Sequence, residues 1–218
     1  KEVGGDFYDM FFLDERHLCM VMADVAGKGI PAALFMVRAM TTIKSRAKEG
    51  GTPAEILFDV NNELTEDNKA KIFVTVWLGI LDMETGVLTE SNAGHENPVV
   101  GYEGRPYEYI KTKHGFVLGG RKNMKYRDDS ISLEPGGTFF IYTDGVIEAT
   151  DIKGERFYND RLLEALNKMA GQKPKDIISH VGEEIRGFVK DAPQFDDMTM
   201  LAVRWQGKKK DKLPGGSL

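Results

Sequence analysis

The stretch VMADVAGKGIPAALFM, residues 21–36, passes from the pattern of a buried strand to that of a helix. Asp24 stands at the end of the apolar run, and two glycines and a lysine separate it from Pro31. Proline suits the first turn of a helix, because its φ is fixed and it lacks the N–H that would be unpaired there. A loop that binds phosphate and a metal centre would both explain a carboxylate at this point.

The segment before this stretch is expected to form a hairpin. Residues 7–14 and 17–25 are apolar runs of strand length, and a polar turn joins them. If the two strands are antiparallel, Asp6 begins one and Asp24 ends its neighbour. Both carboxylates would then lie at the same end of the sheet.

The rest of the chain predicts paired helices around a β-rich middle. One helix follows Pro31 with the apolar stripe Leu34, Val37, Met40 and Ile43. The run Thr52-Pro53-Ala54-Glu55 is typical of the start of a second helix. Further segments read as strands within 73–82, 86–94, 98–102, 106–110, 125–133, 137–145 and 198–206, and as helices over 159–170 and 174–190. Together they predict an α+β fold, a four-layer αββα sandwich with two central antiparallel sheets flanked by helix pairs.

Composition limits the functional classes. The 218 residues suit one domain, and a net charge of −5 gives no basic field for nucleic acid. The single cysteine, Cys19, lies in an apolar run, which favours a core position and a reducing, cytoplasmic setting. No signal peptide or 18-residue apolar span is found, so no membrane segment is expected within this chain.

Aspartates recur where apolar runs meet turns: Asp6, Asp24, Asp144, and the pair Asp196-Asp197. Any one of them alone is typical of an ordinary turn. Taken together they are costly beside a core, unless they are paired with cations or bind a metal. Ligands that are all oxygen select hard ions such as magnesium or manganese.

A nucleotide-phosphate loop is rejected. The P-loop needs a Ser or Thr directly after its Gly-Lys. Here Gly27-Lys28 is followed by Gly29-Ile30-Pro31. Pro31 also removes a backbone donor that an anion site would use.

Five motifs carry a family resemblance: VGGDFYD, ADVAGKGIPAALFM, NAGHENP, YTDGVIEA and DDMTMLAVR. In this order they resemble the metal-dependent protein phosphatases of type 2C, most closely the bacterial SpoIIE/RsbU-like branch. The resemblance covers roughly residues 3 to 205. It predicts a phosphatase domain over 1–206, expected to be the output domain of a longer protein with an upstream sensor. Residues 207–218 form a basic tail that is expected to be disordered. The expected location is cytoplasmic, either as a free protein or as the cytoplasmic part of a membrane-anchored protein.

The resemblance implies a Ser/Thr phosphoprotein phosphatase that uses two manganese or magnesium ions to activate a water. Asp24 would bridge both ions, and the backbone carbonyl of Val25 would bind one of them. Asp144 and Asp196 would complete the coordination of the other ion, with Asp6 nearby. Asp197 stands where related phosphatases often carry asparagine, so its role is left open.

Two further residues and the partners follow from the same resemblance. Lys28 is a candidate contact for the substrate phosphate, with a solvated loop lysine as the equal alternative. His95 fits a turn histidine that bonds backbone between strands better than a catalytic acid. The implied substrate is a phosphorylated anti-sigma-factor antagonist or a similar regulator. The alternative is a catalytically silent binding module that docks partners, which degraded metal positions would favour. Apolar positions on the helices 30–49 and 53–69 could pack in a homodimer or in the core.

Overall fold

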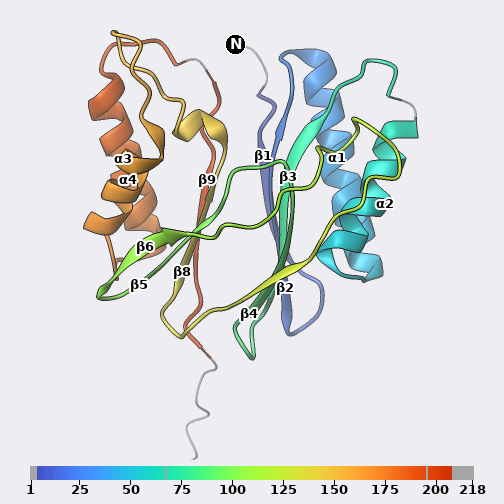
Figure 1. Cartoon of the computed structure of the whole chain (residues 1–218), viewed down its shortest axis with the longest axis horizontal. Coiled ribbons are helices and arrows are strands. Elements are labelled where there is room, and N and C mark those ends of the chain that lie inside the picture. Colours follow the sequence, from blue (N-terminus) through green and yellow to red (C-terminus); the bar gives the residue numbers. More distant parts are fainter. Residues whose placement is uncertain (1–3, 67, 195, 208–218) are drawn as a thin grey trace, which may run out of the picture.

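The computed structural model describes residues 4–66, 68–194 and 196–207, and it confirms the four-layer fold (Figure 1). Two antiparallel sheets face each other, each with a helix pair outside. Sheet A has the order β1 (Phe7–Phe12), β2 (His17–Val25), β3 (Val74–Asp82), β4 (Val87–Ala93), β7 (Asp129–Ser132). Sheet B has the order β6 (Arg105–Tyr109), β5 (Val99–Tyr102), β8 (Thr138–Tyr142), β9 (Met200–Arg204). From residue 208 on, the predicted tail lies outside the described residues.

Local sequence signals set the helix boundaries. α1 (Ile30–Glu49) carries Pro31 in its first turn, as expected. α2 (Pro53–Glu66) begins with a reciprocal cap. The Glu55 N–H donates to Thr52 Oγ1 at 3.3 Å, and the Thr52 N–H donates to Glu55 Oε2 at 2.9 Å. α3 (Tyr158–Lys168) and α4 (Pro174–Val189) form the second pair, on sheet B.

The core lies in three layers, one between the sheets and one beneath each helix pair. Between the sheets, Trp77 on β3 meets Phe139 on β8 with ring centroids 5.1 Å apart. Cys19 is fully buried beneath α1 and α2, which confirms the predicted core position. Burial raises the pKa of its thiol to about 12, so it stays protonated and is a poor nucleophile.

The predicted stripe on α1 is wrong for two of its four residues. Leu34 is 67% exposed and Val37 is 47% exposed, whereas Ile43 is buried as expected. The buried face of α1 instead carries Ala32, Phe35, Ala39, Thr42, Ile43 and Ala47. Both sets satisfy the helical period, and the small alanines let the helix approach sheet A closely.

Within the described ranges, no helix is both long and apolar enough to cross a membrane.

Candidate metal centre

The β1–β2 hairpin brings two of the predicted carboxylates together. Phe7 pairs with Ala23 in an antiparallel register, which puts Asp6 and Asp24 at the same end of sheet A as expected. The backbone of Gly5 passes close to Val25, the residue directly after Asp24. A Cβ on Gly5 would lie 2.8 Å from the Val25 carbonyl oxygen, so no larger residue fits without a shift.

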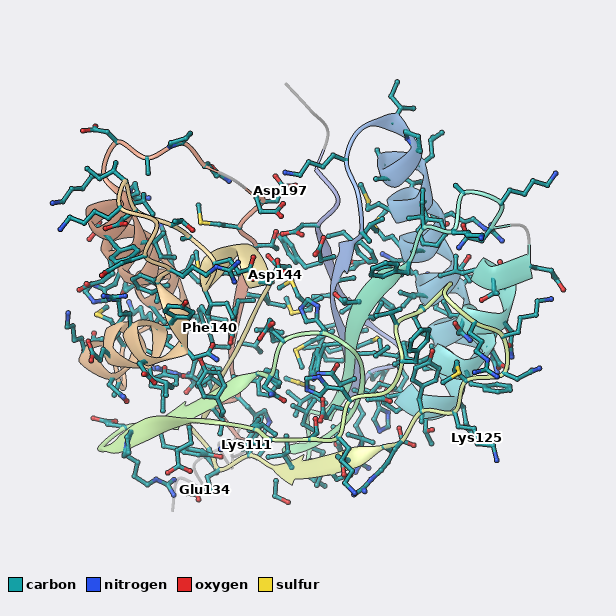
Figure 2. All side chains as sticks on the ribbon, turned by 45° about the horizontal axis from the view of Figure 1, so that its top comes forward. Lys111, Lys125, Glu134, Phe140, Asp144 and Asp197 are labelled. Carbon is teal, nitrogen blue, oxygen red and sulfur yellow. The ribbon has the colours of Figure 1, made fainter. Side chains whose placement is uncertain are left out.

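Sheet B delivers the other carboxylates to the same end. β8 ends at Tyr142, and Asp144 opens the short 3₁₀ turn η1 (Asp144–Val146). Tyr142 pairs with Met200, so the loop that carries Asp196 and Asp197 lies beside this turn. Figure 2 shows Asp144 and Asp197 between the two helix pairs.

Two threonines that flank strands of sheet B orient Asp6, which directly precedes β1 of sheet A. The hydroxyls of Thr143 and Thr199 both donate to Asp6 Oδ2, at 2.6 and 2.8 Å. The two threonines are themselves joined, since the Thr199 N–H donates to Thr143 Oγ1 at 3.1 Å and the Thr143 N–H donates to the Thr199 carbonyl at 3.0 Å. Asp6 is therefore held at the seam between the sheets.

The carboxylates perturb one another strongly. Burial first, and then the nearby charges of Asp6, Asp144 and Asp196, together raise the pKa of Asp24 to about 8. Burial also raises the pKa of Asp6 and of Asp144. Asp6 and Asp24 share a hydrogen bond that lowers the pKa of Asp6 and raises that of Asp24, so Asp24 carries the proton.

These residues fit a hard divalent cation by their chemistry. All the donors are oxygens, and the acids that surround Asp24 disfavour its charge, which a bound cation would reverse. As the side chains stand, no three His, Cys, Asp or Glu residues among those described are arranged to enclose an ion. Asp6 instead accepts the two threonine hydroxyls, and Asp24 bonds to Asp6. Binding would need Asp24 to lose its proton.

The remaining predicted positions differ in setting. Asp197 is half-buried, and its Oδ2 accepts the Gly5 N–H at 3.2 Å, so it touches the glycine pair before Asp6. Asp196 and Lys28 are exposed. Asp9, in the motif VGGDFYD, is not among the predicted ligands, and its carboxylate forms an ion pair with Lys44 of α1 at 2.7 Å.

His95 is 3% exposed and bonds to both sheets. Its Nε2 lies 3.1 Å from the Tyr142 carbonyl oxygen, and its Nδ1 lies 2.9 Å from Thr75 Oγ1. Burial lowers the pKa of the imidazole to about 3, so the ring is neutral. A histidine that bonds backbone between strands is what the sequence favoured.

Two acids near Asp144 were missed by the sequence reasoning. Glu148 raises the pKa of Asp144, and Glu96 has its own pKa raised by burial and then by Asp144 and Glu148. Glu148 follows Asp144 by four residues in YTDGVIEA, and that spacing in a tight turn was the available signal. Glu148 also pairs with Arg156 at 2.6 Å.

Solved structures define the class of the domain. The SiaA-PP2C domain of Pseudomonas aeruginosa superposes with a TM-score of 0.83 at 25% identity, covering 93% of this chain and 81% of that one. The PP2C phosphatase domain structure of SpoIIE from Bacillus subtilis gives 0.81 at 18% identity, covering 95% and 59%, which supports the fold alone. The fold is that of a PP2C-type phosphatase domain.

The sequence profile of the family described as Stage II sporulation protein E (SpoIIE) matches residues 14–206, so the chain belongs to the SpoIIE family. Protein IcfG of Synechocystis is 30% identical over 93% of this chain, and phosphoserine phosphatase RsbU of Bacillus subtilis is 28% identical over 94%. The chain spans 36% of IcfG and 60% of RsbU.

Proposed function

We propose that this chain is a metal-dependent phosphatase that hydrolyses phosphoserine or phosphothreonine on a protein. The observation that carries the proposal is the convergence of Asp6, Asp24, Asp144 and Asp196 from both sheets, each of which influences the pKa of another. The similarity to a protein named phosphoserine phosphatase supports the choice of substrate.

We assign two manganese or magnesium ions to the site. An ion of this size is usually held by one or two carboxylates and keeps several waters. The carboxylates gathered here, with the Val25 carbonyl, are more than one such ion would use. Asp24 would bridge the ions, Val25 would add its carbonyl on one side, and Asp144 and Asp196 would complete the other.

Bound divalent ions lower the pKa of a coordinated water and neutralise phosphoryl oxygens. The chain's own residues then orient the site. Thr143 and Thr199 fix the Asp6 carboxylate, and the Gly5–Val25 contact fixes the carbonyl beside Asp24. Asp197 and Lys28 are proposed at the rim, Asp197 beside Gly5 and Lys28 as a contact to the substrate phosphate.

We further propose that the substrate is a phosphorylated regulator such as an anti-sigma-factor antagonist, and that the domain over 1–206 is the output part of a longer protein. The resemblance of the five motifs supports both proposals. The second is also supported by the fact that the chain spans 60% of the length of RsbU. The alternative, a catalytically silent module, is not favoured, because none of the expected carboxylates is replaced.

The test is hydrolysis of a phosphoserine peptide with Mn²⁺ and with EDTA. Wild type is expected to be active only with Mn²⁺, and Asp24→Asn and Asp144→Asn should fall to the rate without metal. Asp9→Asn is the matched control. Asp9 lies on β1, the strand that begins directly after Asp6, but its carboxylate pairs with Lys44. Full activity in the Asp24 and Asp144 variants would overturn the proposal.

A further inference from the structure

The His95 imidazole joins the two sheets at the end that carries the carboxylates. A carbonyl oxygen can only accept a hydrogen bond, so Nε2 carries the hydrogen and donates to Tyr142. Nδ1 then accepts from the Thr75 hydroxyl. One neutral ring therefore spans from β3 in sheet A to β8 in sheet B.

The two residues that His95 contacts are close neighbours of proposed metal ligands. Thr75 faces Asp24 across the β2–β3 register. Tyr142 is the last residue of β8, two positions before Asp144. The ring thus connects the strand neighbour of one proposed ligand to the strand end that bears another.

The ring is itself held in place by the turn that follows β4. The Asn92 side chain donates to the His95 carbonyl at 3.0 Å and accepts the His95 N–H at 2.8 Å. Asn92 and His95 are both 3% exposed. A buried side chain with its backbone clamped on both sides has little freedom to move, so the link it makes is stiff.

We infer that His95 is a positioning residue that sets the separation of Asp24 and Asp144 by joining β3 to β8. The inference rests on the proposed function, because this separation matters only if both carboxylates hold metal. Ligands need support to within about 0.5 Å, and loss of an outer contact typically weakens metal affinity 10–100-fold. His95 reaches neither substrate nor metal in this role.

The experiment measures Mn²⁺ affinity by calorimetry, together with the melting temperature in EDTA. His95→Leu removes both contacts and should weaken Mn²⁺ binding about 10-fold or more. His95→Gln keeps a donor and an acceptor and should recover part of that loss. His114→Leu is the matched control, because His114 is exposed and bonds only to Asn97 in the described contacts. Its affinity should equal that of wild type.

Thr75→Val provides a second test of the inference if His95→Leu does not fold. It removes the Thr75 hydroxyl, which ties the ring to β3 and also lies 3.5 Å from the Asp24 carbonyl oxygen, and it should also weaken Mn²⁺ binding. A folded His95→Leu, or failing that a folded Thr75→Val, with wild-type affinity would overturn the inference, even if its melting temperature fell. If wild type itself bound no Mn²⁺, the proposed function would fail first, and the inference with it.

Discussion

Replacing Asp24 by asparagine should stabilise the metal-free protein while abolishing its activity. In the folded chain the pKa of Asp24 is about 8, against an ordinary value of 3.8. Folding therefore takes up a proton between these two values, and stability falls as the pH rises from 3.8 to 8. At pH 7 the cost spans about three pH units, or ~4 kcal/mol. Because Asp24 is only half-buried, water screens part of this, and we expect ~2 kcal/mol.

Asp24→Asn carries no charge and escapes that cost. In EDTA at pH 7 its melting temperature should exceed that of wild type by roughly 4–8 °C. At pH 5 the stability advantage of Asp24→Asn should shrink to about a third. The reason is that pH 5 lies closer to 3.8, the pH at which the cost for wild type begins. Excess Mn²⁺ should reverse the order, because wild type binds the ions more tightly and is therefore stabilised more by them. Thermal melts at the two pH values measure this. A variant that is less stable than wild type in EDTA, or a gain that does not change with pH, would refute the reasoning.

Two other predictions concern the buried Glu90 and the contact between Gly5 and Val25. Glu90 accepts the Trp77 indole N–H, and burial raises the pKa of its carboxyl from 4.5 to about 7. The free energy of unfolding of wild type should therefore fall by roughly 3 kcal/mol between these two pH values. Thermal melts of Glu90→Gln should lack this dependence on pH. Gly5→Ala should weaken Mn²⁺ binding in a calorimetric titration by about 10-fold or more, because its Cβ would press on the Val25 carbonyl. Gly187→Ala, on the open face of α4, is the control and should leave that affinity unchanged.

Contacts within a hairpin could be predicted from the sequence, and contacts between sheets could not. The shared end of Asp6 and Asp24 follows from one turn and two apolar runs. The hydrogen bond from Thr199 to Asp6 joins residues 193 positions apart in the chain, and the sequence of neither segment predicts it. Thr143 and Thr199 therefore passed unnoticed, although both lie inside quoted motifs.

The helix face of α1 was ambiguous for a different reason. Leu34 and Val37 satisfy the helical period as well as Phe35 and Ala39 do. Only the contact with sheet A selects the second set, and it does so through small residues that score weakly as apolar. Size complementarity at an interface is a property of two segments, so one segment's pattern does not contain it.

The most direct test of the central claim is a calorimetric titration of the wild-type chain with Mn²⁺ at pH 7, repeated in buffers of different ionisation enthalpy. Two ions should bind per chain, and their binding should release about one proton, because Asp24 is protonated in the metal-free site. Asp24→Asn should bind more weakly and release none. Absence of Mn²⁺ binding to wild type, or binding without proton release, would contradict the account.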